Sequence, residues 1–203
     1  MIYEFCAENV TLLEKAMQAG ARRIELCDNL AVGGTTPSYG VTKAAVELAA
    51  NYNTTIMTMI RPRGGDFVYN DLEIAIMLED IRLTAQAGSQ GVVFGALTAD
   101  KKLDKPNLEK LIAASKGMEI VFHMAFDELS EEDQLEAIDW LSQAGVARIL
   151  TRAGVSGDSL DKRFAHSKGK IEILPGGGID LDNRQTFIDQ LGVTQLHGTK
   201  VVF

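Results

Sequence analysis

Two short apolar segments near the start of the chain each carry one glutamate and one cysteine at the same spacing. Glu4 and Cys6 lie in the segment 2–6, and Glu25 and Cys27 lie in the segment 23–27. Successive side chains of a strand point to opposite faces, so each glutamate shares a face with its cysteine. If the two segments are parallel neighbouring strands, we expect the two thiols to converge on one spot.

The chemistry of such a pair of thiols depends on whether they are ligands or core residues. Thiolate and thioether sulfurs are soft donors that match Cu(I), and Met57 or Met59 on the next predicted strand could add a sulfur. A free cysteine is also a common small residue of protein cores, and methionines on strands usually belong to the core. From these residues alone, metal binding and core packing both stay open.

Acid–base groups follow other predicted strands. Arg61 comes after the third strand, His123 ends the fifth and His197 ends the eighth. With Glu25 as a carboxylate, these groups could move a proton on a small substrate, and Glu25, His123 and Arg61 are the candidate catalytic residues if the protein is an enzyme. A buried glutamate is costly unless paired, so we expect Glu4 and Glu25 to meet Arg61, Arg152 or a histidine.

A glycine-rich turn follows the seventh predicted strand. Its backbone N–H groups are free to approach an anion, and a helix predicted to begin near Asp182 would add the positive end of its dipole. The alternative is a tight turn that needs small residues. The candidate anion-binding residues are Arg61, Arg63, Arg152, Gly176, Gly177, Gly178 and His197.

These residues need a scaffold of alternating strands and helices. Hydrophobic patterns and helix caps predict strands near 2–6, 23–27, 54–60, 91–94, 119–123, 147–151, 170–174 and 194–197. They predict helices near 8–19, 41–51, 70–87, 107–115, 131–143, 158–166 and 182–191. This alternation favours one TIM-barrel-like (β/α)8 domain over residues 1–203, close to the short limit of roughly 200 residues for that fold. A doubly wound sheet is the alternative, but its dinucleotide fingerprint is missing.

The predicted barrel lacks its last covering helix, because the sequence ends at Phe203, just past the eighth strand. The helices are expected to pack on the outer face of the barrel, and this flank has none. We therefore expect an apolar flank there, which invites a second copy of the chain. A homo-oligomer is predicted, with a dimer favoured.

Composition narrows the classes of function. The formal net charge of the 203 residues is −8, which argues against nucleic acid as a partner. The longest apolar runs have the length of strands, so no membrane span is expected. The N-terminus carries Glu4 and Glu8 and no basic-then-apolar leader, which predicts a cytoplasmic protein with two free thiols.

Several blocks of the sequence closely resemble the CutC family. They span the chain in the family's order and include Glu4-Phe5-Cys6, Gly20 to Cys27, Gly33 to Gly40, Ile60 to Phe67, Gly91 to Gly95, Phe122 to Asp127, Ile149 to Thr151 and Leu174 to Ile179. The Arg61-Pro62-Arg63-Gly64-Gly65 block and the Gly33-Gly34-Thr35-Thr36-Pro37-Ser38 loop are its most specific parts. Many members of the family run longer at the C-terminus.

The resemblance implies a cytoplasmic TIM-barrel-like protein of copper homeostasis that binds Cu(I) and forms oligomers. The cysteines proposed as copper ligands in the family correspond to Cys6 and Cys27. A second hypothesis is an enzyme that acts on a small phosphorylated or carboxylated metabolite by acid–base chemistry. The arginines and histidines at the strand ends, which exceed what a copper site needs, favour that alternative.

Overall fold

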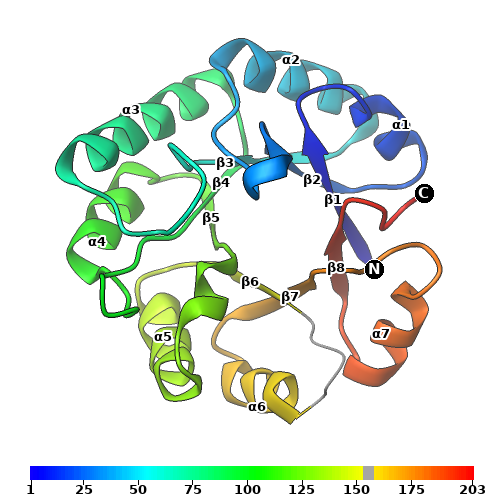
Figure 1. The fold of residues 1–203 in the computed structure, drawn as a ribbon. Helices are drawn as coiled ribbons and strands as arrows, with labels where there is room; N and C mark the ends of the chain where they lie inside the picture. Colours follow the sequence, from blue (N-terminus) through cyan, green and yellow to red (C-terminus); the bar gives the residue numbers. More distant parts are fainter. Residues whose placement is uncertain (153–157) are drawn as a thin grey trace.

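The fold is a barrel of eight parallel strands inside a ring of helices (Figure 1). The computed structural model describes residues 1–152 and 158–203. The strands are β1 (Ile2–Glu8), β2 (Arg23–Cys27), β3 (Thr55–Met59), β4 (Gly91–Phe94), β5 (Glu119–Phe122), β6 (Arg148–Arg152), β7 (Glu172–Gly176) and β8 (Gln195–Gly198). Their order in the sheet is β7-β6-β5-β4-β3-β2-β1-β8, so strands β1 to β6 each pair with the next strand in sequence, and β8 pairs with β1. The predicted (β/α)8 barrel is confirmed.

Helices follow the first seven strands and cover the outside of the barrel. They are α1 (Leu13–Gln18), α2 (Tyr39–Ala49), α3 (Asp71–Ala87), α4 (Lys105–Ala114), α5 (Glu131–Gln143), α6 (Asp158–Ser167) and α7 (Arg184–Leu191). Short 3-10 turns are present at Leu30–Val32, Ala50–Tyr52 and Met124–Glu128. No helix in the part of the chain that the structure describes is long and apolar enough to cross a membrane.

Local sequence explains where several helices begin and end. Asn70 and Glu73 form a reciprocal capping box at the start of α3, and Ser130 caps α5 through the backbone N–H of Asp133. Gly88 ends α3 in the left-handed conformation, with φ +87°. The predicted start of the first helix at residue 8 is wrong, because β1 continues to Glu8 and Asn9 then turns the chain at φ +56°.

The flank between α7 and α1 is covered in part by the C-terminal segment (Figure 1). Val201 and Val202 are buried there, and the Phe203 ring lies 5.2 Å from the Phe5 ring, centroid to centroid. The ammonium of Lys15 stands 4.1 Å above the Phe203 ring. The last covering helix is absent, as predicted, but the flank is less open than expected.

Candidate functional site

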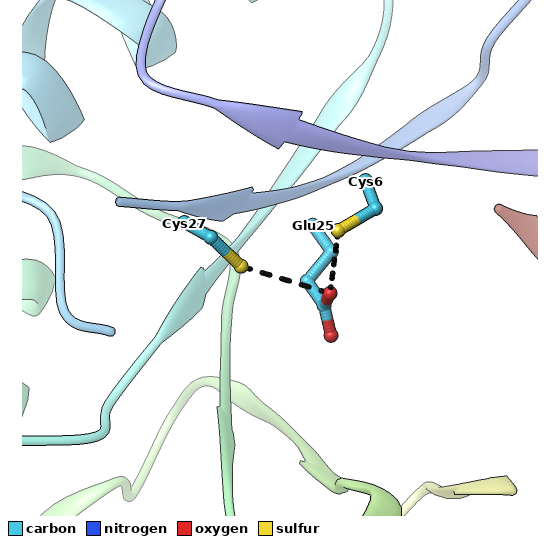
Figure 2. Close-up of side chains that lie close together, drawn as sticks. All are labelled: Cys6, Glu25 and Cys27. Carbon is cyan, nitrogen blue, oxygen red and sulfur yellow. Dashed lines mark hydrogen bonds between the residues drawn. The ribbon is translucent and has the colours of Figure 1, made fainter. Parts of the chain in front are cut away.

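The two cysteines and Glu25 meet inside the barrel because of the register between β1 and β2. Cys6 lies opposite Glu25, and Glu8 lies opposite Cys27. Both thiols donate to the same Glu25 oxygen, from 3.2 Å for Cys6 Sγ and 3.7 Å for Cys27 Sγ (Figure 2). The two sulfurs and a Glu25 oxygen all lie within 4.8 Å of one another. The predicted convergence of the thiols is confirmed.

Buried polar side chains in contact with one another lead from β8 to this cluster, and we call them the polar chain. Arg23 donates through Nε to Glu4 Oε2 and through Nη2 to Gln195 Oε1, the latter at 2.6 Å. The other Glu4 oxygen lies 2.8 Å from His197 Nδ1, and His197 Nε2 lies 3.7 Å from Glu25 Oε2. The polar chain therefore links β8, β2 and β1 to the carboxylate that both thiols contact.

Electrostatics sets the charge of the two groups in the centre of this chain. Burial would raise the pKa of Glu4, but the Arg23 charge and the His197 contact lower it to about 2. Burial would lower the pKa of His197, but Glu25, Cys6 and Glu4 together hold it well above its ordinary value. Glu4 is thus a carboxylate at neutral pH, and His197 holds its proton more tightly than an ordinary histidine.

The two thiols differ from each other in their proton affinity. Hydrogen bonding with Cys27 holds the pKa of Cys6 well below its ordinary value, burial opposes this, and His197 strengthens it. The same pairing, then burial and the Glu25 charge, raises the pKa of Cys27. Burial first, and then Cys6, raises the pKa of Glu25. Of the two thiols, Cys6 therefore loses its proton more readily than Cys27.

Two methionines complete the sulfur-rich region, with different contacts. Met57 and Met59 belong to the same buried cluster as both cysteines. The sulfur of Met57 accepts from Arg148 Nη2 at 3.8 Å, so it is engaged away from the thiols. The Met59 methyl lies beside Gly34, which itself lies against Cys27, so Met59 is the closer candidate for a third sulfur.

The loop behind β2 brings its backbone against the second thiol. Gly34 has φ +88°, and a Cβ built on it would lie 3.1 Å from Cys27 Sγ. The left-handed conformation and the close approach both require glycine here. The glycine-rich loop after Cys27 therefore places the backbone of Gly34 against the sulfur, and we call this segment the backbone lid over Cys27.

A cavity of about 220 Å³ brings several predicted site residues together. Its wall includes Cys6, Glu25, Arg61, His123 and His197. All five side chains are buried. The structure therefore places the three candidate catalytic residues, Glu25, His123 and Arg61, around the space that the Cys6 sulfur also lines.

The other predicted anion-binding residues lie outside this cavity. Arg63 donates to Glu73 Oε1 at 2.5 Å and pairs with Asp66 on the loop before α3. Arg152 is exposed at the end of β6, and its side chain runs beside Gly177. Gly176 belongs to β7, where a side chain would meet the His197 ring.

Gly177 and Gly178 line an adjoining pocket of about 390 Å³, with Asp180 and Lys200, and His197 lines both spaces. The Asp180 carboxylate accepts from the backbone N–H groups of Asp182 and Asn183, each at 3.0 Å. The amides near the predicted helix start at Asp182 therefore already have an acceptor within the chain. Helix α7 begins only at Arg184, and anion binding at this loop stays a prediction.

Sequence reasoning missed two members of the polar chain, Arg23 and Gln195. Both had a usable signal in the alternation of strand side chains. Arg23 shares a face with Glu25 and Cys27, and Gln195 shares a face with His197. Glu4 was expected to meet Arg61, Arg152 or a histidine, and its partners are Arg23 and His197.

Comparisons with known proteins agree over the length of the chain. The model of the CutC family matches residues 1–202. A family protein CutC of Enterococcus faecalis is 52% identical over 209 residues, with all of both chains covered. The human copper homeostasis protein cutC homolog is 40% identical over 201 residues, which are 97% of this chain and 72% of the human protein.

Solved structures agree as well. The crystal structure of CutC from Streptococcus agalactiae superposes with a TM-score of 0.94 at 43% identity, covering 99% of each chain. QR15, an aldolase, gives a TM-score of 0.71 at 15% identity over 98% of this chain and 89% of the aldolase, and this likeness shows the barrel fold alone.

Proposed function

The chain belongs to the CutC family, and from this premise and the geometry of its thiols we propose that it serves copper homeostasis by binding Cu(I) through Cys6 and Cys27. The observation that carries the proposal is the meeting of the two sulfurs and a Glu25 oxygen within 4.8 Å of one another. Binding and release of the ion need no catalytic step.

The separation of the sulfurs suits one shared ion. A transition metal such as zinc makes bonds of about 2.3 Å to thiolate sulfur, so one ion reaches two sulfurs up to about 4.6 Å apart. The two strands already hold the thiols near that span. Binding at Cys6 and Cys27 therefore requires little more than adjustment of side chains.

The surroundings of the thiols favour a soft ion. The pKa of the Cys6 thiol lies well below its ordinary value, which favours a thiolate ligand, and Met59 belongs to the same buried group. Cys27 is fully buried and Cys6 is 7% exposed. Thiolate ligands in a dry shell select Cu(I) over harder cations, and a shell of this kind controls the access of solvent to the metal.

The proposed setting is the cytoplasm, where thiols stay reduced. We also propose a homo-oligomer, with a dimer favoured. Apolar side chains beside the incompletely covered flank support it, because Ile2, Val10 and Leu12 are each at least 40% exposed. In this proposal each chain binds its copper ion at Cys6 and Cys27, and a second copy of the chain binds at the flank between α7 and α1.

Anaerobic titration of the reduced protein with Cu(I) against a competing chelator tests the copper proposal. We expect one-to-one binding that is lost in the Cys6→Ser/Cys27→Ser variant. Met59→Leu is the matched control, because it removes a nearby sulfur at similar volume and is expected to change the affinity less than tenfold. Binding that ignores both cysteines would contradict the proposal.

A further inference from the structure

Arg61 is a buried cation without an acidic partner. Its side chain and backbone together are 4% exposed. Nη1 donates to the carbonyls of Val32 at 2.9 Å and Gly34 at 3.0 Å, and Nη2 donates to that of Gly65 at 2.8 Å. Among residues 1–152 and 158–203, no carboxylate oxygen makes a salt bridge with it, and its Nε has no partner.

Such an arrangement is costly for a protein that only needs to hold a loop. Carbonyl oxygens satisfy the guanidinium donors, but they carry no net charge, and an unpaired buried charge is strongly unfavourable. Asp66 and Glu73 both pair with Arg63, and Glu25, which lines the same cavity, contacts the two thiols and His197 through Oε2. The positive charge of Arg61 is therefore available to an anion from outside the chain.

His123 offers a second donor to the same space. Its Nδ1 accepts from the backbone N–H of Ala125 at 3.2 Å, which places the ring proton on Nε2. That Nε2 has no partner within the described residues, and His123 is 4% exposed. Burial, and then the Arg61 charge, lower the pKa of His123 to about 3, so the ring stays a neutral N–H donor at physiological pH.

The two donors are held in place by surrounding residues. The Phe67 ring lies 4.8 Å from the His123 ring, and the Arg61 guanidinium lies 4.8 Å from the Phe67 ring. Gly95 leaves room for the imidazole, because a Cβ there would lie 2.7 Å from His123 Cε1. Arg61 Nε and His123 Nε2 have no hydrogen-bond partner among the described residues, and donors held in this way are typical of a preorganised binding site.

We propose that the cavity lined by Arg61 and His123 binds the carboxylate group of a small organic acid, a function that goes beyond copper binding. One guanidinium balances one negative charge, and the His123 N–H adds a neutral hydrogen bond. A single guanidinium matches the one charge of a carboxylate better than the two charges of phosphate, and the acidic residue Glu25 lines the same cavity.

The size of the cavity limits the acid. About 220 Å³ corresponds to roughly seven times the share of liquid volume of one water molecule, about 30 Å³. The acid therefore has about four to seven heavy atoms, the size range of a C2 to C4 metabolite. Its non-acidic end would lie toward Cys6 and Glu25, which line the same space.

The test uses the reduced, copper-free, full-length protein with propionate as the probe. Propionamide matches its shape without the charge, and inorganic phosphate tests the preference for a monoanion. The readout is the NMR signal of His123 Nε2, with His166 on α6 as the internal reference. We expect saturable shifts at His123 with propionate, at least tenfold weaker binding of propionamide, and weaker binding of phosphate.

Variants separate this site from the copper site. His123→Phe removes the donor and should weaken propionate binding at least tenfold, measured by the spectral changes at the backbone amides of Gly95 and Phe67. Cys27→Ser removes a thiol that does not line this cavity and should bind propionate as the native chain does, so failure of the copper proposal leaves this one standing. Shifts that do not saturate, or that propionamide reproduces equally in the native protein, would overturn the proposal without need of any variant.

Discussion

Glu4 and His197 lie 193 positions apart in the sequence, yet Glu4 Oε1 and His197 Nδ1 are 2.8 Å apart in the barrel. This contact joins the first and last strands, where Glu4 stands opposite His197 in the β1–β8 register. Closure of the barrel therefore creates the polar chain that ends at the two thiols. The polar groups around the thiols therefore depend on the pairing of β1 with β8.

The buried ion pair between Glu4 and Arg23 predicts an asymmetry between two variants. Glu4→Gln leaves Arg23, which is 5% exposed, without its counter-charge, and should lower the free energy of unfolding by about 3–5 kcal/mol. Glu4→Gln/Arg23→Met removes both charges and should be less destabilised than Glu4→Gln alone. Denaturant unfolding of the copper-free proteins measures the free energy of unfolding of both variants. A double variant that is less stable than Glu4→Gln would contradict the role assigned to the ion pair.

The backbone lid over Cys27 predicts a selective effect of Gly34→Ala. The variant strains a residue at φ +88° and presses a methyl group on Cys27 Sγ, so we expect about 1 kcal/mol less stability and at least tenfold weaker Cu(I) binding. Gly33→Ala is the matched control, because its φ is +89° but its Cβ would meet Arg61 Nη1 at 3.2 Å. Equal losses of copper affinity in the two variants would show that the contact with Cys27 is irrelevant.

The neutral state of His123 predicts a pH-dependent stability. Its pKa is about 3 in the folded protein and about 6.5 in the unfolded chain, so between these values the unfolded state binds the extra proton. Stability from this group is complete above pH 6.5 and falls as the pH decreases toward 3. From pH 6.5 to pH 5 the loss is about 2 kcal/mol.

Unfolding of the native chain and of His123→Gln at pH 7 and pH 5 measures this contribution. The glutamine variant carries no titrating group at the position, so its loss of stability over the same interval should be smaller by about 2 kcal/mol. Identical losses in the two proteins would mean that His123 already carries a proton at pH 5.

Exposed apolar side chains beside the C-terminal segment predict a second copy of the chain. Ile2, Val10 and Leu12 remain exposed although Val201 and Val202 are buried. Small-angle scattering should give twice the mass of one chain, and Leu12→Glu should shift the equilibrium toward one. A monomeric mass of the native protein at micromolar to millimolar concentration would rule the oligomer out.

The convergence of Cys6 with Cys27 was predictable because it needs only two local rules. Alternation fixes which residues share a face, and a parallel pair of neighbouring strands brings equivalent positions together. The same rules place eight strands and seven helices in order. The capping residues Asn70 and Ser130 were readable for the same reason, since their partners are three residues away.

Other parts of the site depend on distances that the sequence does not encode locally. The contact between Glu4 and His197 requires β8 to return to β1, and so does the contact of Arg23 with Gln195. The Asp180 carboxylate accepts hydrogen bonds from the backbone of its own turn and so competes with an external anion there. Residue types alone do not decide whether the carboxylate or the anion occupies these N–H groups. The covering of β1 by Phe203 is a tertiary contact of the same kind.

X-ray absorption at the copper edge of the one-to-one Cu(I) complex identifies the atoms that touch the metal. We expect sulfur to dominate the first coordination shell, with two sulfurs in the native protein and one in Cys27→Ser. Coordination by nitrogen or oxygen alone, or a spectrum that stays the same in Cys27→Ser, would contradict binding of Cu(I) through Cys6 and Cys27.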